Sequence, residues 1–238
     1  MNKNDSPVLV LTAHGSADPR SSAITHAVAE QIRRLRPCLD VRVAFCERSE
    51  PNLRDVLADL DRPGLVTPLL LASAYHARVD IPAMMEEAKV PVRQADTLGE
   101  DPRLVDVLHQ RLTERDLQPG DDTGVLVVAV GSSHASANER TATLASTLSE
   151  RGGWGQVRVA YATTAPSVAE GIGELRSGGA DRIAVAPWFI APGLITDRVA
   201  AVAADLGVEM AEPLGAHPLL AATVLDRFDR AVAARLAA

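Results

Sequence analysis

The strongest constraint on the fold is that the sequence carries one pattern twice. An apolar run followed by small polar residues recurs at an offset of 117, and two later segments recur at an offset of 116. The matching pairs are 8–16 with 125–133, 41–45 with 157–161, and 98–99 with 214–215. Matches in the same order at nearly one offset indicate a tandem duplication. Each copy is expected to contain about four strands, every strand followed by a helix.

Each copy reads as alternating strands and helices, which is typical of an α/β fold with a parallel sheet. Residues 118–124, Gln-Pro-Gly-Asp-Asp-Thr-Gly, are polar and turn-rich and indicate a linker. We therefore predict two similar parallel-sheet lobes, 1–118 and 124–238, that face each other across a cleft. A fused pair already contains the interface that a half-length chain gains by dimerising, so we expect a monomer.

Composition excludes several classes of function. The net charge is -7, aromatic residues make up 3%, and no segment gathers Lys and Arg, so nucleic-acid binding is not expected. No apolar run approaches the roughly 20 residues that span a bilayer, and the N-terminus is polar, so we expect no membrane segment and a cytoplasmic protein. The two cysteines, Cys38 and Cys46, indicate no disulfide framework.

A histidine stands where the first predicted strand ends. His14 follows the apolar run 8–13, and a helical pattern begins just beyond Pro19. In open parallel sheets, ligands bind outside the carboxyl ends of the strands. Gly15 allows the backbone to turn sharply and to approach a ligand closely. The amides that follow, with Ser16, lie near a helix N-terminus, which favours negative charge.

Two further polar residues follow the next strands. Glu47 comes directly after the strand 41–45, and His76 follows the apolar run 65–71. Because parallel strands end at one edge, His14, Glu47 and His76 are expected to converge. Two imidazoles and a carboxylate suit Fe, Co, Ni or Zn, and they can also accept protons near neutral pH. The alternative is that they are separate loop residues, with Glu47 merely solvated.

The second copy lacks these three residues. His14 aligns with Gly131, Glu47 with about Thr163, and His76 with about Ile195. A purely structural residue has no reason to vanish while the surrounding pattern persists. The asymmetry therefore favours a functional site in the first copy and a degenerate one in the second. His134 lies near the position equivalent to His14, but its half has no companion ligands.

These residues resemble the type II chelatases, in particular the fused two-repeat sirohydrochlorin chelatases of sirohaem and cobalamin synthesis. The family contains short single-unit homodimers and longer fused forms, which agrees with the duplication. The similarity extends over essentially the whole chain. The matching pieces are His14-Gly15-Ser16, Phe45-Cys-Glu47-Arg-Ser-Glu50-Pro51, Pro68 to His76, Asp80-Ile-Pro82, and Leu98-Gly99 with Asp101-Pro102. Cys46 and Arg48 flank Glu47 where the family usually has apolar residues, which predicts a changed pocket polarity or metal choice.

The resemblance implies insertion of Fe²⁺ or Co²⁺ into sirohydrochlorin without ATP and without a cofactor beyond the substrate metal. It assigns metal handling and catalysis to His14 and His76, joined by Glu47. Gly15, Ser16 and Arg78 are expected to contact the tetrapyrrole, whose carboxylates need local cations in a chain of net charge -7. No GxxxxGK[ST] loop for ATP is present.

Two other readings remain open. The protein could be a carrier that holds a tetrapyrrole or a metal ion without inserting it. It could also be a phosphatase-like α/β enzyme that uses His14 as nucleophile. The second reading is weaker, because a phosphohistidine enzyme is expected to show Arg-His-Gly, and Ala13 precedes His14 here.

Overall fold

The computed structural model describes residues 7–72, 76–115 and 117–236. The chain divides into two compact units. Unit 1 contains Met1–Gly99 and Ala216–Ala238, and unit 2 contains Glu100–Gly215. Each unit is built on a sheet of four parallel strands, which confirms the predicted α/β class.

The sheet of unit 1 has the order β2-β1-β3-β4. Its strands are β1 (Val8–Ala13), β2 (Val41–Phe45), β3 (Gly64–Pro68) and β4 (Val92–Gln94). Its helices are α1 (Pro19–Leu35), α2 (Leu53–Ala58), the π-helix η1 (His76–Asp80), α3 (Ile81–Met85) and α9 (Pro218–Leu236). Strand β1 is central in this sheet and is buried along its whole length.

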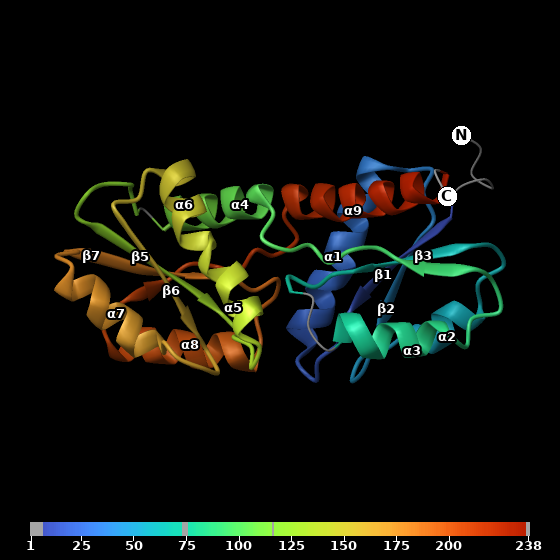
Figure 1. Cartoon of the computed structure of the whole chain (residues 1–238), viewed down its shortest axis with the longest axis horizontal. Coiled ribbons are helices and arrows are strands. Elements are labelled where there is room, and N and C mark those ends of the chain that lie inside the picture. The colour runs from blue at the N-terminus through green and yellow to red at the C-terminus, as the bar shows by residue number, and fades with distance from the viewer. Residues whose placement is uncertain (1–6, 73–75, 116, 237–238) are drawn as a thin grey trace. The chain divides into compact units, whose positions relative to one another are not determined.

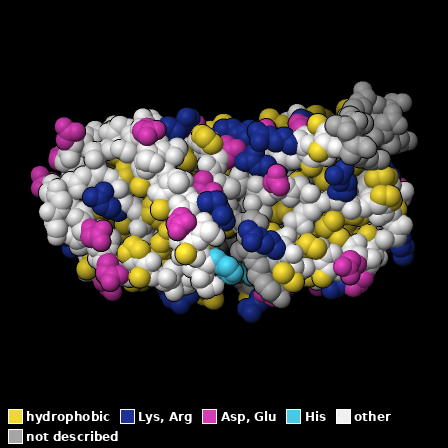
Figure 2. Space-filling model, in the orientation of Figure 1, with side chains coloured by type: hydrophobic (Ala, Val, Ile, Leu, Met, Phe, Trp, Pro, Cys, Tyr) yellow, Lys and Arg dark blue, Asp and Glu magenta, His cyan; other side chains and the backbone are white. Residues whose placement is uncertain are grey.

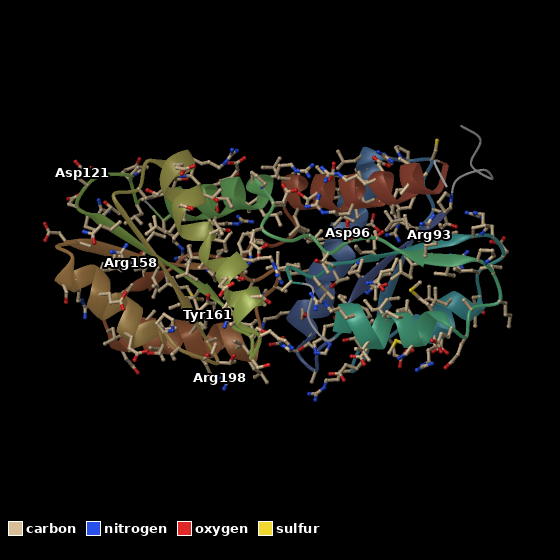
Figure 3. The ribbon with its side chains drawn as sticks, in the orientation of Figure 1. Arg93, Asp96, Asp121, Arg158, Tyr161 and Arg198 are labelled. Carbon is tan, nitrogen blue, oxygen red and sulfur yellow. The ribbon has the colours of Figure 1, made fainter. Side chains whose placement is uncertain are left out.

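The sheet of unit 2 repeats this order as β6-β5-β7-β8. Its strands are β5 (Thr123–Ala129), β6 (Gln156–Tyr161), β7 (Arg182–Pro187) and β8 (Glu209–Met210). Its helices are α4 (Pro102–Thr113), α5 (Ala135–Ala142), α6 (Leu144–Gly152), α7 (Val168–Ser177) and α8 (Leu194–Asp205). The hydroxyl of Tyr161, labelled in Figure 3, donates to the carbonyl oxygen of Asn138 at 2.9 Å and ties β6 to α5.

The two repeats exchange their last helices. Helix α4 ends the first repeat but packs against α6 and β7 of unit 2, and α9 ends the second repeat but packs against α1 and β3 of unit 1 (Figure 1). The compact units therefore differ from the predicted lobes 1–118 and 124–238. The apolar faces of α4 and α9 are buried on the sheet of the other repeat, which the order of elements along the chain does not reveal.

Helix α1 shows how sequence signals set the local structure of unit 1. The Asp18 carboxylate accepts from the Arg20 amide and caps the helix, and Pro19 occupies its first position. The buried face includes Val28 and Ile32, at helical spacing. The helix therefore begins at Pro19 itself, where the sequence indicated a start just beyond that proline.

Charged side chains of both signs lie on the surface that Figure 2 presents, with Lys and Arg interspersed with Asp and Glu. Within the described ranges, no helix is long and apolar enough to cross a lipid bilayer.

Candidate functional site

The loops after β1 and β2 are joined by their backbones at the carboxyl edge of the unit 1 sheet. The Cys46 amide donates to the Ala13 carbonyl and the Glu47 amide to the His14 carbonyl, both at 3.0 Å. These bonds continue the parallel pairing of β1 with β2 for two residues beyond the strands. They place the side chains of His14 and Glu47 next to each other, as the sequence predicts.

Gly15 allows this close approach between the two loops. Its φ is 93°, and a Cβ at this position would stand 1.7 Å from the Glu47 carbonyl oxygen. Only glycine fits such a backbone without strain. The close neighbour of Gly15 in the structure is the backbone of Glu47, and its predicted approach to a ligand stays a prediction.

Ser16 is held by a single side chain from the neighbouring loop. Its amide donates to the Ser49 hydroxyl oxygen at 3.1 Å, and that hydroxyl donates to the Ser16 carbonyl at 2.9 Å. The Ser16 hydroxyl oxygen accepts from the Asp18 amide at 3.0 Å. These bonds give Ser16 a part in shaping the loop, and its contact with the tetrapyrrole stays a prediction.

The Glu47 carboxylate stands between a histidine and an arginine. Its Oε1 lies 3.5 Å from His14 Nε2 and 3.1 Å from Arg48 Nε. The side chains of His14 and Glu47 are 42% and 46% exposed, so both can reach a ligand from solvent. An imidazole beside a carboxylate can accept a proton or coordinate a divalent ion, and the carboxylate balances the positive charge that results.

The third predicted ligand lies on the π-helix that follows β3. His76 is the first residue of η1, and Arg78 lies exposed in the same helix. The side chain of His76 falls outside the described residues, so its convergence with His14 and Glu47 stays a prediction. Among the side chains that the structure does describe, no three His, Cys, Asp or Glu are grouped closely enough to hold a metal ion.

Cys46 precedes Glu47 in the chain, and its side chain belongs to the core of unit 1. It is buried in the apolar cluster that includes Leu53 and Ile81. Burial, with smaller contributions from the charges of Asp80 and Glu47, raises the pKa of the Cys46 thiol to about 11. The thiol is therefore protonated at neutral pH in the metal-free protein.

Two arginines near the edge are held by carboxylates. Arg20 lies 2.6 Å from Asp18, and the hydrogen bond from the Arg20 side chain holds the pKa of Asp18 below its usual range. Arg54, at the start of α2, forms an ion pair with Glu87. Arg48 differs from both, because its only carboxylate partner in the described part of the chain is the candidate site residue Glu47 itself.

Unit 2 has the same loop backbone without the site. Gly131 has a φ of 92°, nearly that of Gly15, and the Thr163 amide donates to the Val130 carbonyl at 3.0 Å. The structural counterpart of His14 is therefore Val130, and the alignment of His14 with Gly131 was wrong by one residue. The pairing of Glu47 with Thr163 is correct.

Arg48 and Ser49 are the residues of this edge whose roles the sequence did not predict. Arg48 figured only as an unusual neighbour of Glu47, and Ser49 had no role. A signal for Arg48 was present, because the equivalent residue of the second repeat is Thr164. The charge on Arg48 is thus confined to the same repeat as the candidate site.

Comparisons with known proteins agree with this fold and duplication. A sequence model of the CbiX family matches residues 8–115 and again residues 124–231, which confirms the predicted internal repeat. The chain is 27% identical over 208 residues to the sirohydrochlorin ferrochelatase of Priestia megaterium, covering 80% of this chain and 78% of that protein. It is 25% identical over 243 residues to the sirohydrochlorin cobaltochelatase of the same organism, covering 92% and 78%.

Solved structures share the whole architecture. SirB from Bacillus subtilis with Fe³⁺ matches with a TM-score of 0.82 at 20% identity, over 94% of this chain and 95% of that one. CbiX, described as the terminal enzyme for biosynthesis of siroheme in denitrifying bacteria, matches with a TM-score of 0.68 at 22% identity, over 95% and 99%. Both likenesses cover the two units together.

Proposed function

The chain belongs to the CbiX family, and we infer that it is a sirohydrochlorin chelatase, an enzyme that inserts a divalent metal ion into sirohydrochlorin. The observation that carries this conclusion is the family match over both repeats. The relatives include a ferrochelatase and a cobaltochelatase, so Fe²⁺ and Co²⁺ are the two candidate metals.

We place the chemistry at the carboxyl edge of the unit 1 sheet. Insertion replaces two pyrrole N–H protons by one divalent ion, so the site needs a proton acceptor and a metal ligand. His14 can serve as either, and Glu47 at 3.5 Å stabilises the imidazolium or the bound ion. We assign His76, at the start of η1, as the second metal-handling residue of this edge.

The tetrapyrrole is held by groups around this pair. Sirohydrochlorin carries several carboxylates, and the exposed Arg78 on η1 is a suitable partner for one of them. Gly15 and Ser16 form the adjoining loop. The reaction needs no ATP and no cofactor beyond the metal substrate. A monomer, a cytoplasmic location and the lack of a nucleic-acid partner stay predictions.

The experiment that tests the assignment follows sirohydrochlorin absorbance after addition of Co²⁺ or, under anaerobic conditions, Fe²⁺. Protein is present at about one-hundredth of the tetrapyrrole concentration. Many turnovers per protein molecule are expected. A change that stops at one equivalent would instead show a carrier, the first of the two alternatives that the sequence left open.

Variants locate the reaction within the chain. His14→Ala and His76→Ala are each expected to lower the insertion rate roughly 100-fold or more, because each removes a metal-handling or proton-accepting imidazole. The control is His134→Ala, because His134 is exposed in unit 2, where Thr163 takes the place of Glu47. Equal losses from His14→Ala and His134→Ala would contradict a site in unit 1.

A further inference from the structure

Arg48 has an unusual backbone conformation within the loop that carries Glu47. Its φ is 57°, and it is the one residue other than glycine with a positive φ in the described ranges. The Ser49 amide donates to the Glu47 carbonyl at 2.8 Å, which closes a three-residue γ-turn with Arg48 at its centre. This form of the γ-turn is rare and strained, and such strain persists only where neighbouring structure imposes it.

The neighbouring loop imposes this conformation from both sides. Before the turn, the Glu47 amide is bound to the His14 carbonyl. After the turn, the Ser49 hydroxyl both donates to and accepts from the backbone of Ser16. Arg48 itself is 67% exposed. The backbone is thus fixed, while the guanidinium remains accessible to solvent.

The Arg48 guanidinium and a metal ion held by His14 would compete for the same oxygen atom of Glu47. Arg48 Nε and His14 Nε2 both approach Oε1 of Glu47, at 3.1 and 3.5 Å. A guanidinium has five N–H donors in a planar fork, which matches a carboxylate through two parallel hydrogen bonds. Arg48 Nε lies 3.1 Å from Glu47 Oε1, and the 67% exposed side chain can offer the remaining donors of its fork to a second carboxylate.

We propose that Arg48 is a specificity-determining residue that binds a carboxylate of the incoming tetrapyrrole and so releases Glu47 for the metal ion. This rests on the function proposed above. In the free protein, Arg48 neutralises Glu47 and holds it near His14. When the substrate arrives, the guanidinium turns to the substrate carboxylate, and Oε1 of Glu47 becomes available to the metal ion. Arg20 and Arg54 are less suited to this exchange, because their carboxylate partners are Asp18 and Glu87.

The test measures the affinity of the Arg48→Leu variant for sirohydrochlorin and for Co²⁺ in separate experiments. Leucine, like arginine, is unbranched at Cβ, so the strain of the turn is retained. The equilibrium dissociation constant for sirohydrochlorin without metal is expected to rise roughly three- to tenfold. This is the change expected when one exposed charge-assisted hydrogen bond is lost. The dissociation constant for Co²⁺ without tetrapyrrole is expected to stay the same or fall, because Glu47 loses its competing cation.

Two further variants separate charge from geometry. Arg48→Lys keeps the charge but loses the fork, so its affinity for sirohydrochlorin is expected to lie between those of the wild type and Arg48→Leu. Arg34→Leu removes one positive charge from an exposed position on α1 and is expected to leave both constants unchanged.

Two results would overturn the proposal. Unchanged affinity for sirohydrochlorin in Arg48→Leu would show that Arg48 does not contact the substrate. Parallel weakening of sirohydrochlorin and Co²⁺ binding would show that Arg48 only maintains the loop. Both readouts are equilibrium constants, so they remain informative if the wild type shows no turnover and the chelatase assignment itself fails.

Discussion

The backbone of Gly15 lies directly against the carbonyl group of Glu47, although the two residues belong to different loops. A Cβ on Gly15 would stand 1.7 Å from the Glu47 carbonyl oxygen. The position of the Glu47 side chain relative to His14 therefore depends on the absence of a side chain at residue 15. The site is held by a backbone contact between two strand ends.

Gly15→Ala is expected to separate these loops and to lower the insertion rate strongly. The added methyl group must displace Glu47, and the φ of 93° is itself unfavourable for alanine. We expect a loss of roughly 3 kcal/mol in the free energy of unfolding, at the upper end for a strained residue. Urea unfolding and the Co²⁺ insertion rate measure the two effects.

Gly179→Ala is the matched control for this variant. Gly179 has a similar φ of 87°, and a Cβ there would meet no atom within 4 Å. It is expected to cost roughly 1 kcal/mol of stability from backbone strain alone, with no effect on the insertion rate. Equal stability losses in the two variants would contradict the close contact with Glu47.

Glu47→Gln tests the charge of the carboxylate while keeping its size. The amide cannot balance an imidazolium or a divalent ion, so the insertion rate is expected to fall roughly 100-fold with little change in stability. Initial rates with Co²⁺ check this. The control is Glu50→Gln in the same loop. Glu50 is exposed, and its carboxylate accepts a hydrogen bond from the Asn52 amide. A similar loss in both variants would contradict a special role for Glu47.

The sequence was sufficient to predict the duplication, the two parallel sheets and the pairing of His14 with Glu47. Buried parallel strands are apolar runs with clear ends, and those ends meet at one edge of the sheet. The one-residue error at His14 has a physical cause. Neighbouring positions in Val- and Leu-rich strands resemble each other. The matching φ angles of Gly15 and Gly131 and the matching hydrogen bonds to the His14 and Val130 carbonyls fix the alignment.

The exchange of α4 and α9 and the turn at Arg48 could not be predicted in this way. Helical periodicity identifies an apolar face, but the two repeats offer sheets of the same kind for that face to cover. The turn at Arg48 depends on the bonds of Ser49 to Ser16, which is 33 residues away in the sequence. Such contacts leave no local pattern.

Cys46 is expected to make stability fall at alkaline pH. Its pKa of about 11 in the folded protein exceeds the value of 9.0 for a free thiol, mainly because of burial. Below pH 9 the thiol is protonated in both states and adds no pH dependence. Between pH 9 and 11 the unfolded thiol ionises while the folded one does not, so the free energy of unfolding falls as pH rises.

Urea unfolding of the wild type and Cys46→Ala at pH 8, 9 and 10 measures this effect. The stability advantage of the wild type is expected to shrink as pH rises, because alanine does not ionise. The exposed Cys38 is the internal control, since a thiol reagent at pH 8 should modify Cys38 in the folded protein and leave Cys46 unmodified. Rapid modification of both thiols would contradict the buried, protonated state.

A leucine-to-alanine substitution in each exchanged helix tests to which unit that helix belongs. Leu108 on α4 and Leu220 on α9 are both fully buried, and both tryptophans, Trp154 and Trp188, lie in unit 2. Leu108→Ala is expected to lower the unfolding free energy followed by tryptophan fluorescence by about 2–5 kcal/mol. Leu220→Ala is expected to destabilise unit 1, seen by circular dichroism, with a much smaller shift in fluorescence. The reverse pattern would place α4 with the first repeat, as the predicted lobe 1–118 requires.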